Sequence, residues 1–203
     1  MKPLFYCLFE TALGWCGIAW RASSASTPVV FFQLPEATQA TTEQKIARDC
    51  GGKPSEPPPE IVEIIRKIRK HLSGCPQDFR DIVLDPEGIS VFAQQVYAAS
   101  RAIPAGQTRT YGEIAKDLNR PTAARAVGQA LGKNPVALIV PCHRVLAAGG
   151  KPGGFSAHGG QTTKARMLEI EGVVVGLPTN IKSKRDFQRA ADHLKAADPK
   201  LAK

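Results

Sequence analysis

The stretch 110–145 reads TYGEIAKDLNRPTAARAVGQALGKNPVALIVPCHRV and decides how the C-terminal half of this chain is organised. Its apolar spacing predicts two short helices, over 110–118 and 122–131, separated by a break at Asn119 and Arg120. Pro121 opens the second helix, where proline is favoured because its missing N–H would find no intrahelical partner anyway. Two short helices joined by a tight turn on a basic chain are a helix-turn-helix candidate.

The second predicted helix has an unusual surface for a helix that reads DNA. Its one long cationic side chain is Arg125, whereas sequence-specific readout in the major groove needs several long polar side chains. A slim helix suits the minor groove, which is about 6 Å wide. Small residues also favour helix formation and close packing, so both interpretations stay open. The small residues are Ala123, Ala124, Ala126 and Gly128.

The stretch ends on a cysteine with polar neighbours. A free thiol with a pKa of about 8.5 is only a few per cent thiolate at pH 7, and adjacent imidazole or guanidinium groups raise that fraction. Cys142 is followed by His143 and Arg144, which carry both groups. In a regular strand Cys142 and His143 would point to opposite faces, so either the backbone turns after Pro141 or a water bridges thiol and ring. The alternative is an inert core cysteine behind an aliphatic run.

A histidine that acts as a base needs an orienting partner on its other ring nitrogen. The nearest downstream acids are Glu169 and Glu171. The pattern of thiol, imidazole and carboxylate indicates a reactive cysteine without fixing its purpose.

The N-terminal half predicts a smaller α/β unit. Residues 9–12 and 14–20 are expected to form two strands around a turn, although the apolar start of the chain and the small residues 22–25 imitate a secretory signal. Further expected elements are a strand at 29–32, a helix at 42–48, a loop at 51–59, an amphipathic helix at 61–72 and a strand at 82–84.

The C-terminal half opens with a predicted helix over 91–103, after a boundary at 85–88. We therefore expect an α/β chain in two parts with a tail. Residues 1–85 form a small α/β domain, 86–175 form a mostly helical DNA-binding domain with the reactive cysteine, and 176–203 form a basic tail.

Composition restricts the class of partner. The 203 residues are 43% hydrophobic and carry a net charge of +9, which favours a globular protein with a polyanionic partner. Five cysteines without a CxxC pair indicate neither a disulfide framework nor a zinc site, so we expect a reducing compartment, no metal and no cofactor. No stretch is long and apolar enough to span a membrane, and we expect a cytoplasmic monomer, associated with the nucleoid if bacterial.

An ordered set of motifs resembles one known family. The motifs are Tyr111-Gly112-Glu113-Ile114-Ala115, Ala123-Ala124-Arg125-Ala126-Val127-Gly128, Asn134-Pro135, Pro141-Cys142-His143-Arg144-Val145, Gly154-Phe155-Ser156 and Glu171-Gly172. In this order they resemble the O6-alkylguanine-DNA alkyltransferases, strongly over 91–172 and more weakly before it. The resemblance implies a repair protein that flips O6-alkylguanine, and O4-alkylthymine, out of duplex DNA. It transfers the alkyl group to its own cysteine once and irreversibly.

The resemblance also implies roles for individual residues. Cys142 would accept the alkyl group, His143 would take the thiol proton through a water, and Glu171 would orient that imidazole. Tyr111 would rotate the nucleotide and protonate the departing guanine oxygen, and Asn134 would brace the turn before the reactive segment.

Arg125 would enter the duplex in place of the flipped nucleotide. The carbonyls of Cys142 and Val145, with Ser156, would hold the base, while Phe155 stands where relatives often carry tyrosine. The expected DNA- and base-contacting residues are Arg125, Ala123, Ala124, Ala126, Gly128, Arg144, Val145, Phe155 and Ser156.

Two other classes of function compete with this interpretation. A damage-binding module would flip alkylated bases without repairing them, but such relatives lack the acceptor cysteine. A cysteine hydrolase could use Cys142 and His143, although thiol proteases place these residues far apart in sequence. His158 is expected to be a loop residue rather than a second base.

Overall fold

The computed structural model describes residues 3–22 and 26–173. The N-terminal part is built on a four-stranded sheet, and the predicted strand pair is confirmed as an antiparallel hairpin in which Phe9 faces Cys16. The sheet order is β3-β2-β1-β4, and its strands are β1 (Leu4–Thr11), β2 (Gly14–Arg21), β3 (Val29–Gln33) and β4 (Lys53–Pro54). The predicted tail at 176–203 lies outside the described residues.

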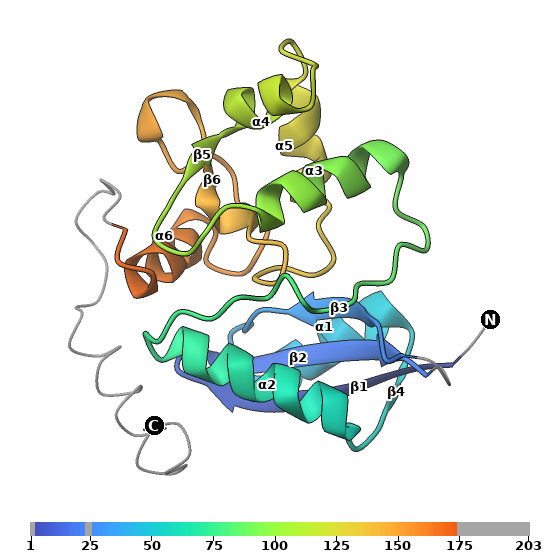
Figure 1. The fold of residues 1–203 in the computed structure, drawn as a ribbon. Coiled ribbons are helices and arrows are strands. Elements are labelled where there is room, and N and C mark those ends of the chain that lie inside the picture. The colour runs from blue at the N-terminus through green and yellow to red at the C-terminus, as the bar shows by residue number, and fades with distance from the viewer. Residues whose placement is uncertain (1–2, 23–25, 174–203) are drawn as a thin grey trace.

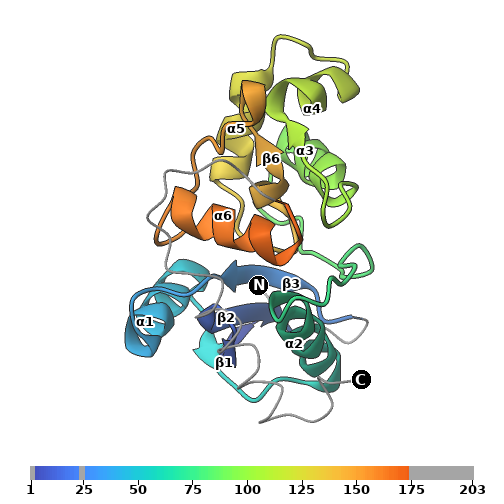
Figure 2. The same ribbon diagram turned by 90° about the vertical axis from the view of Figure 1, so that its left-hand side faces the viewer.

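Two helices cover opposite faces of this sheet (Figures 1 and 2). They are α1 (Gln39–Cys50) and α2 (Pro59–Leu72). Side chains alternate between the faces of a strand, so Tyr6 and Ala19 pack with Ile46 of α1, while Phe9 and Ile18 join the cluster that contains α2. The predicted apolar stripe of α2 is confirmed, because Ile61, Ile65 and Ile68 are buried.

Three N-terminal predictions need correction. The loop expected at 51–59 contains the short strand β4, and its last residue, Pro59, is the first of α2. Helix α1 begins earlier than residue 42 because Thr38 and Thr41 form a capping box, and it ends at Gly51, whose left-handed conformation (φ 62°) stops it. The strand expected at 82–84 is only an isolated bridge from Leu84 to Val29.

The C-terminal part holds four α-helices within the described residues (Figure 1). These are α3 (Val91–Arg101), α4 (Tyr111–Asp117), α5 (Ala124–Gly132) and α6 (Gln161–Ile170). Two short strands, β5 (Arg109–Thr110) and β6 (Val145–Leu146), pair in parallel, and two 3-10 turns are η1 (Cys142–Arg144) and η2 (Ala148–Gly150).

The two-helix unit is present, with one boundary shifted. Asn119 takes the left-handed conformation (φ 58°) in the turn between α4 and α5. The second helix starts at Ala124 rather than at residue 122, because the first i to i−4 bond runs from the Val127 N–H to the Ala123 carbonyl. Pro121 therefore lies in the turn, and Ala123 is the N-cap.

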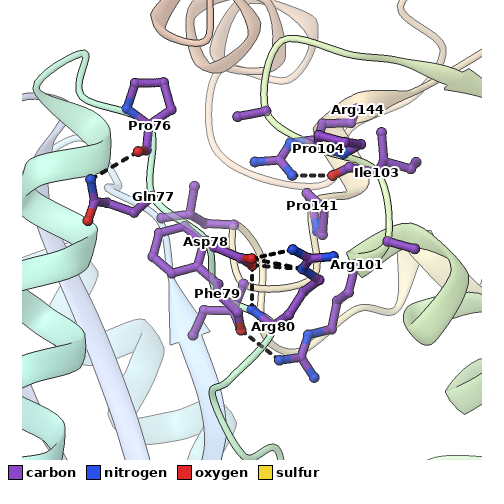
Figure 3. A pocket seen from close by; sticks show the side chains of 14 residues that line it. Pro76, Gln77, Asp78, Phe79, Arg80, Arg101, Ile103, Pro104, Pro141 and Arg144 are labelled. Carbon is purple, nitrogen blue, oxygen red and sulfur yellow. Dashed lines mark hydrogen bonds and ion pairs between the residues drawn. The ribbon is translucent and has the colours of Figure 1, made fainter.

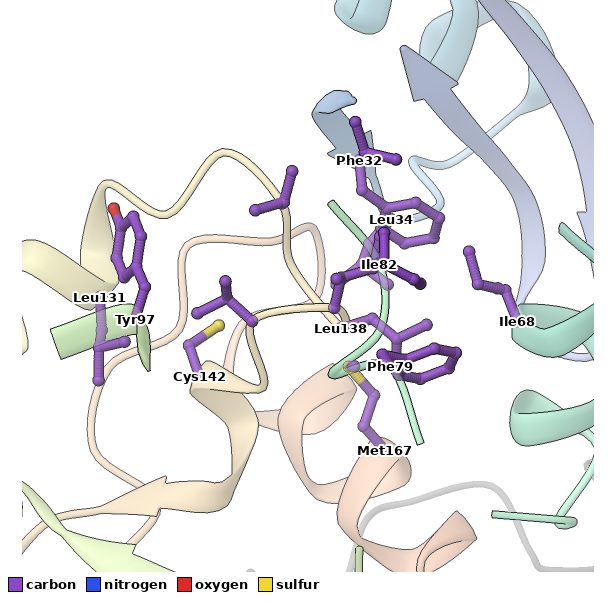
Figure 4. Close-up of a cluster of buried hydrophobic side chains, with 14 of the residues drawn as sticks. Phe32, Leu34, Ile68, Phe79, Ile82, Tyr97, Leu131, Leu138, Cys142 and Met167 are labelled. Carbon is purple, nitrogen blue, oxygen red and sulfur yellow. The ribbon is translucent and has the colours of Figure 1, made fainter. Parts of the chain in front are cut away.

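One hydrophobic core runs through both parts (Figure 4). Phe32 and Ile68 from the sheet unit belong to the same buried cluster as Leu138 and Met167 from the C-terminal part. The edge strand β3 also bonds the C-terminal part directly, since the Phe32 N–H donates to the Pro135 carbonyl at 2.8 Å. The segment that leads to Cys142 is thereby fixed on the sheet, and the predicted two-part α/β fold is confirmed. No helix among the described residues is long and apolar enough to cross a membrane.

Candidate active site

The backbone turns at Cys142, which is one of the two geometries that the sequence left open. Cys142 is the first residue of η1 and is 9% exposed. The turn before it is held by Asn134, whose Nδ2 donates to the Val140 carbonyl at 2.9 Å and whose Oδ1 accepts from the Val136 N–H at 3.0 Å. Within this segment Leu138 has a φ of 71°, a conformation that non-glycine residues rarely adopt.

Cys142 lies on a pocket of about 540 Å³ that joins α5 to the loop before α6. The pocket brings together half of the fourteen site residues that the sequence predicts. Its lining includes Cys142, Tyr111, Ala124, Arg125, Gly128, Phe155 and Ser156.

Two of the small residues on α5 do not line this pocket. Ala123 caps the helix, and Ala126 lines a separate groove with Tyr97. Gly128 lies against the ring of Tyr111, where an added Cβ would meet the ring carbons at 3.8 Å.

A buried histidine–glutamate pair stands behind the cysteine. His143 is fully buried, and its Nε2 lies 2.9 Å from Oε1 of Glu171, the residue that follows α6. Of the two downstream acids, Glu171 is therefore the partner of His143. Burial by itself raises the pKa of Glu171, but hydrogen bonds from His143, His71 and Arg144 lower it well below its ordinary value.

The tautomer of His143 is set by this carboxylate. An ionised carboxylate only accepts hydrogen bonds, so Nε2 of the ring carries the proton. Nδ1 then presents a lone pair, and it is buried without a hydrogen-bond partner among the described residues. Burial lowers the pKa of His143, with the positive charge of Arg144 acting in the same direction and Glu171 opposing both. His143 is thus a neutral imidazole with a free acceptor at neutral pH.

The expectation that Arg144 contacts DNA needs correction. This residue is 6% exposed, and its guanidinium forks onto Glu171 with Nε–Oε2 and Nη2–Oε1 distances of 2.9 and 2.8 Å. Its Nη1 donates to the Ile103 carbonyl (Figure 3). Arg144 lines a different pocket, of about 230 Å³, which does not include Cys142. Its guanidinium is buried and bonded to Glu171 and Ile103, so it does not face a DNA ligand.

A lysine that sequence reasoning missed also belongs to the site. Lys164 on α6 is fully buried; its Nζ donates to the Val145 carbonyl at 2.6 Å and lies 5.8 Å from the centre of the Tyr111 ring. Burial lowers its pKa to about 8, and the nearby Cys142 opposes that shift. The signal was its position on α6, where Lys164 shares a helical face with the buried Met167 and Leu168.

The thiol itself is subject to opposing effects. Burial raises the pKa of Cys142, while the side-chain hydrogen bond from Asn134 and the charge of Lys164 lower it. Burial also raises the pKa of Tyr111, and the negative charge of a Cys142 thiolate adds to that rise. Tyr111 therefore keeps its proton at neutral pH.

The carbonyls of Cys142 and Val145 already accept hydrogen bonds. The Val145 N–H donates to the Cys142 carbonyl, and Lys164 donates to the Val145 carbonyl. Each oxygen retains a second lone pair for a ligand. His158 lies apart from these groups, 3.5 Å from Glu36 in an exposed loop. Among the described residues, no group of three or more His, Cys, Asp or Glu side chains is arranged around a metal site.

Comparison with known proteins gives one consistent result. The family model for the 6-O-methylguanine DNA methyltransferase, DNA binding domain, matches residues 91–173. A methylated-DNA–protein-cysteine methyltransferase of Methanosarcina acetivorans is 46% identical over 110 residues, which cover 54% of this chain and 68% of that protein.

Solved structures agree over a longer range. The O6-methylguanine methyltransferase of Mycobacterium tuberculosis superimposes with a TM-score of 0.66 at 32% identity, covering 87% of this chain and 96% of that one. The OGT protein of the same organism in complex with DNA gives 0.64 at 31% identity, covering 83% and 93%. Similarity of this extent, in sequence and in fold together, shows that the chain belongs to the family of methylated-DNA–protein-cysteine methyltransferases.

Proposed function

We propose that this protein repairs duplex DNA by flipping O6-alkylguanine, and O4-alkylthymine, into the Cys142 pocket and taking the alkyl group onto Cys142 in a single turnover. The observation that carries the proposal is the position of the Cys142 thiol on a 540 Å³ pocket, next in sequence to a buried neutral histidine with a free Nδ1. Family membership supplies methyl transfer from DNA to a protein cysteine. The contacts around the pocket support a role for a particular residue at each step of that transfer.

The substrate base has to leave the helix before it can react. A thiolate cannot line up behind the alkyl carbon of a stacked guanine, so the nucleotide is extruded at a cost of a few kcal/mol. Arg125 is exposed on α5 at the pocket and can fill the space that the nucleotide leaves. Ala124 and Gly128 keep the same side of α5 slim, which lets the helix approach the minor groove.

The transfer step balances without a cofactor. The thiol proton passes through a bridging water to Nδ1 of His143, and the thiolate attacks the alkyl carbon. The new S–C bond forms as the C–O6 bond breaks, with the leaving oxygen opposite the sulfur. The electron pair stays on the guanine, which takes a proton from the Tyr111 hydroxyl. The His143 imidazolium then gives the former thiol proton back to the Tyr111 oxygen through water, so both side chains end neutral.

Two features of the cluster favour proton transfer to His143. The Glu171 carboxylate holds Nε2–H and stabilises the imidazolium that forms, while Arg144 balances the charge of Glu171 beforehand. The cluster therefore begins neutral, and the base is unprotonated when substrate arrives.

The product explains why the protein acts once. A thioether has no carbonyl for water to attack, so nothing in the site removes the alkyl group.

The test is transfer from duplex DNA that carries one O6-methylguanine, with mass mapping of the protein. We expect one methyl per protein molecule, on the peptide that contains Cys142, and none in Cys142→Ala. Cys75→Ala is the matched control and should transfer normally, because Cys75 does not line the pocket. A second duplex with O4-methylthymine tests the wider substrate range.

Three results would contradict the proposal. They are repeated turnover, label that persists in Cys142→Ala, and tight binding of the damaged duplex without transfer. The last result would identify a damage-binding module instead. A cysteine hydrolase would show itself by turnover of an ester or amide substrate with no methyl on the protein.

A further inference from the structure

A second histidine reaches the buried carboxylate from the other part of the chain. His71, near the end of α2, is 1% exposed, and its Nε2 lies 3.0 Å from Oε1 of Glu171. The two residues are 100 positions apart in sequence. Oε1 therefore accepts from His143, His71 and Arg144 together.

The backbone fixes which proton His71 carries. The Gln77 N–H donates to Nδ1 of His71 at 3.1 Å, so Nδ1 must be unprotonated. The proton then sits on Nε2 and points at Glu171. The Phe79 ring, with its centroid 5.1 Å from that of His71, packs beside it.

We propose that His71 is a positioning residue for alkyl transfer: it holds Glu171 from the N-terminal part of the chain and limits how strongly this carboxylate attracts a proton onto His143. The inference rests on the function proposed above. It gives the sheet unit a role in the chemistry, because α2 supplies a hydrogen-bond donor to the group behind the base.

His71 affects the protonation of His143 because both rings donate to the same oxygen, Oε1 of Glu171. Each donor on Oε1 withdraws negative charge from it, so removing one strengthens the bond to His143 and favours the imidazolium. The charged and titratable groups that face His71 and His143 are Glu171 and Arg144. Cys142 is next to His143 along the chain. Without the His71 donor, His143 should therefore become protonated at a higher pH. In the lower part of the neutral pH range it would then be unable to take the thiol proton.

Two substitutions separate the two bonds of His71. His71→Gln places an amide N–H near the position of Nε2 and keeps a donor for Glu171, whereas His71→Asn keeps an acceptor for Gln77 and loses that donor. The measurement is the single-turnover rate of methyl transfer from the damaged duplex between pH 5 and pH 9. We expect the acid limb of the Asn variant to move up by about half to one pH unit, and that of the Gln variant to stay near the unsubstituted protein.

The experiment distinguishes failure of this inference from failure of the proposed function. If the unsubstituted protein transfers no methyl, the proposed function is wrong. If it transfers methyl and both variants share one pH profile, His71 is only structural. The tautomer gives a check that needs no variant: nitrogen NMR of the neutral His71 ring should show a proton on Nε2 and none on Nδ1. A proton on Nδ1 would overturn the inference even if the Asn variant fails to fold.

Discussion

At the scale of single residues, the site depends on charges that are buried and shared. Glu171 is held by Arg144 and two histidines, and Lys164 stands beside the thiol with its pKa lowered to about 8. A lysine this deep is kept charged only by its surroundings, which here are the Val145 carbonyl and the Tyr111 ring. Its charge lowers the pKa of Cys142 and so offsets part of the rise that burial causes.

Replacing Lys164 by methionine should raise the pKa of Cys142, because a positive charge that stabilises the thiolate is lost. We expect the thiol titration, followed by alkylation rate against pH, to move up by about half to one unit. Lys151→Met is the matched control, since Lys151 is exposed and does not line the pocket. An unchanged titration in Lys164→Met would show that Asn134 alone offsets burial.

At the scale of elements, the predictable features were those with local causes. The hairpin, the stripe of α2 and the pairing of α4 with α5 are explained by alternation, helical spacing and a left-handed residue at Asn119. The segment 82–84 has strand-like composition, but its one β-bridge within the described residues is from Leu84 to Val29. Sequence spacing cannot show how many neighbours a strand will find.

The same limit applies to the site. Cys142, His143 and Glu171 could be grouped from motifs, but the direction of the Arg144 side chain could not. His71 continues the buried stripe of α2, three residues after Ile68, and its partner lies in a distant segment. Only tertiary packing brings those two residues together.

Helix α5 carries the prediction that belongs to this scale. Arg125→Ala should slow methyl transfer from duplex DNA about tenfold or more, because no side chain then fills the gap left by the flipped nucleotide. Transfer from a single-stranded oligonucleotide should change much less, since that substrate needs no extrusion. Lys133→Ala, at the far end of α5, controls for loss of positive charge. Equal slowing on both substrates would mean that Arg125 acts on phosphates or on the base itself.

At the scale of the whole molecule, one core and one buried charge cluster join the two parts. Phe32, Ile68 and Leu138 share a hydrophobic cluster, while His71 and Glu171 link α2 to the end of α6. Continuous burial of this kind favours a single cooperative unfolding transition.

His143 and Glu171 both bind protons less readily in the folded state than in the unfolded chain. The pKa of His143 is lowered from 6.5 and that of Glu171 from 4.5, so their stabilising contribution is complete above about pH 6.5 and is lost as the pH falls. Urea unfolding should therefore give a smaller free energy at pH 5 than at pH 7.5. His143→Gln should reduce that difference.

The same experiment tests the unity of the fold. Trp15 and Trp20 both lie in β2 and report on the sheet, and the reactivity of Cys142 reports on the C-terminal part. We expect coincident transitions. A thiol that becomes accessible before the tryptophan signal changes would indicate that the parts unfold separately.

Leu138 has a consequence for how this chain can evolve. Its left-handed backbone favours glycine and costs leucine about 1 to 2 kcal/mol, yet the side chain is 1% exposed in the core between the two parts, where burial contributes about 1.5 to 3 kcal/mol. Glycine would remove the backbone strain but leave a cavity in the core. A β-branched residue would fill the core but increase the backbone strain. Position 138 therefore tolerates few residue types, although it does not line the Cys142 pocket.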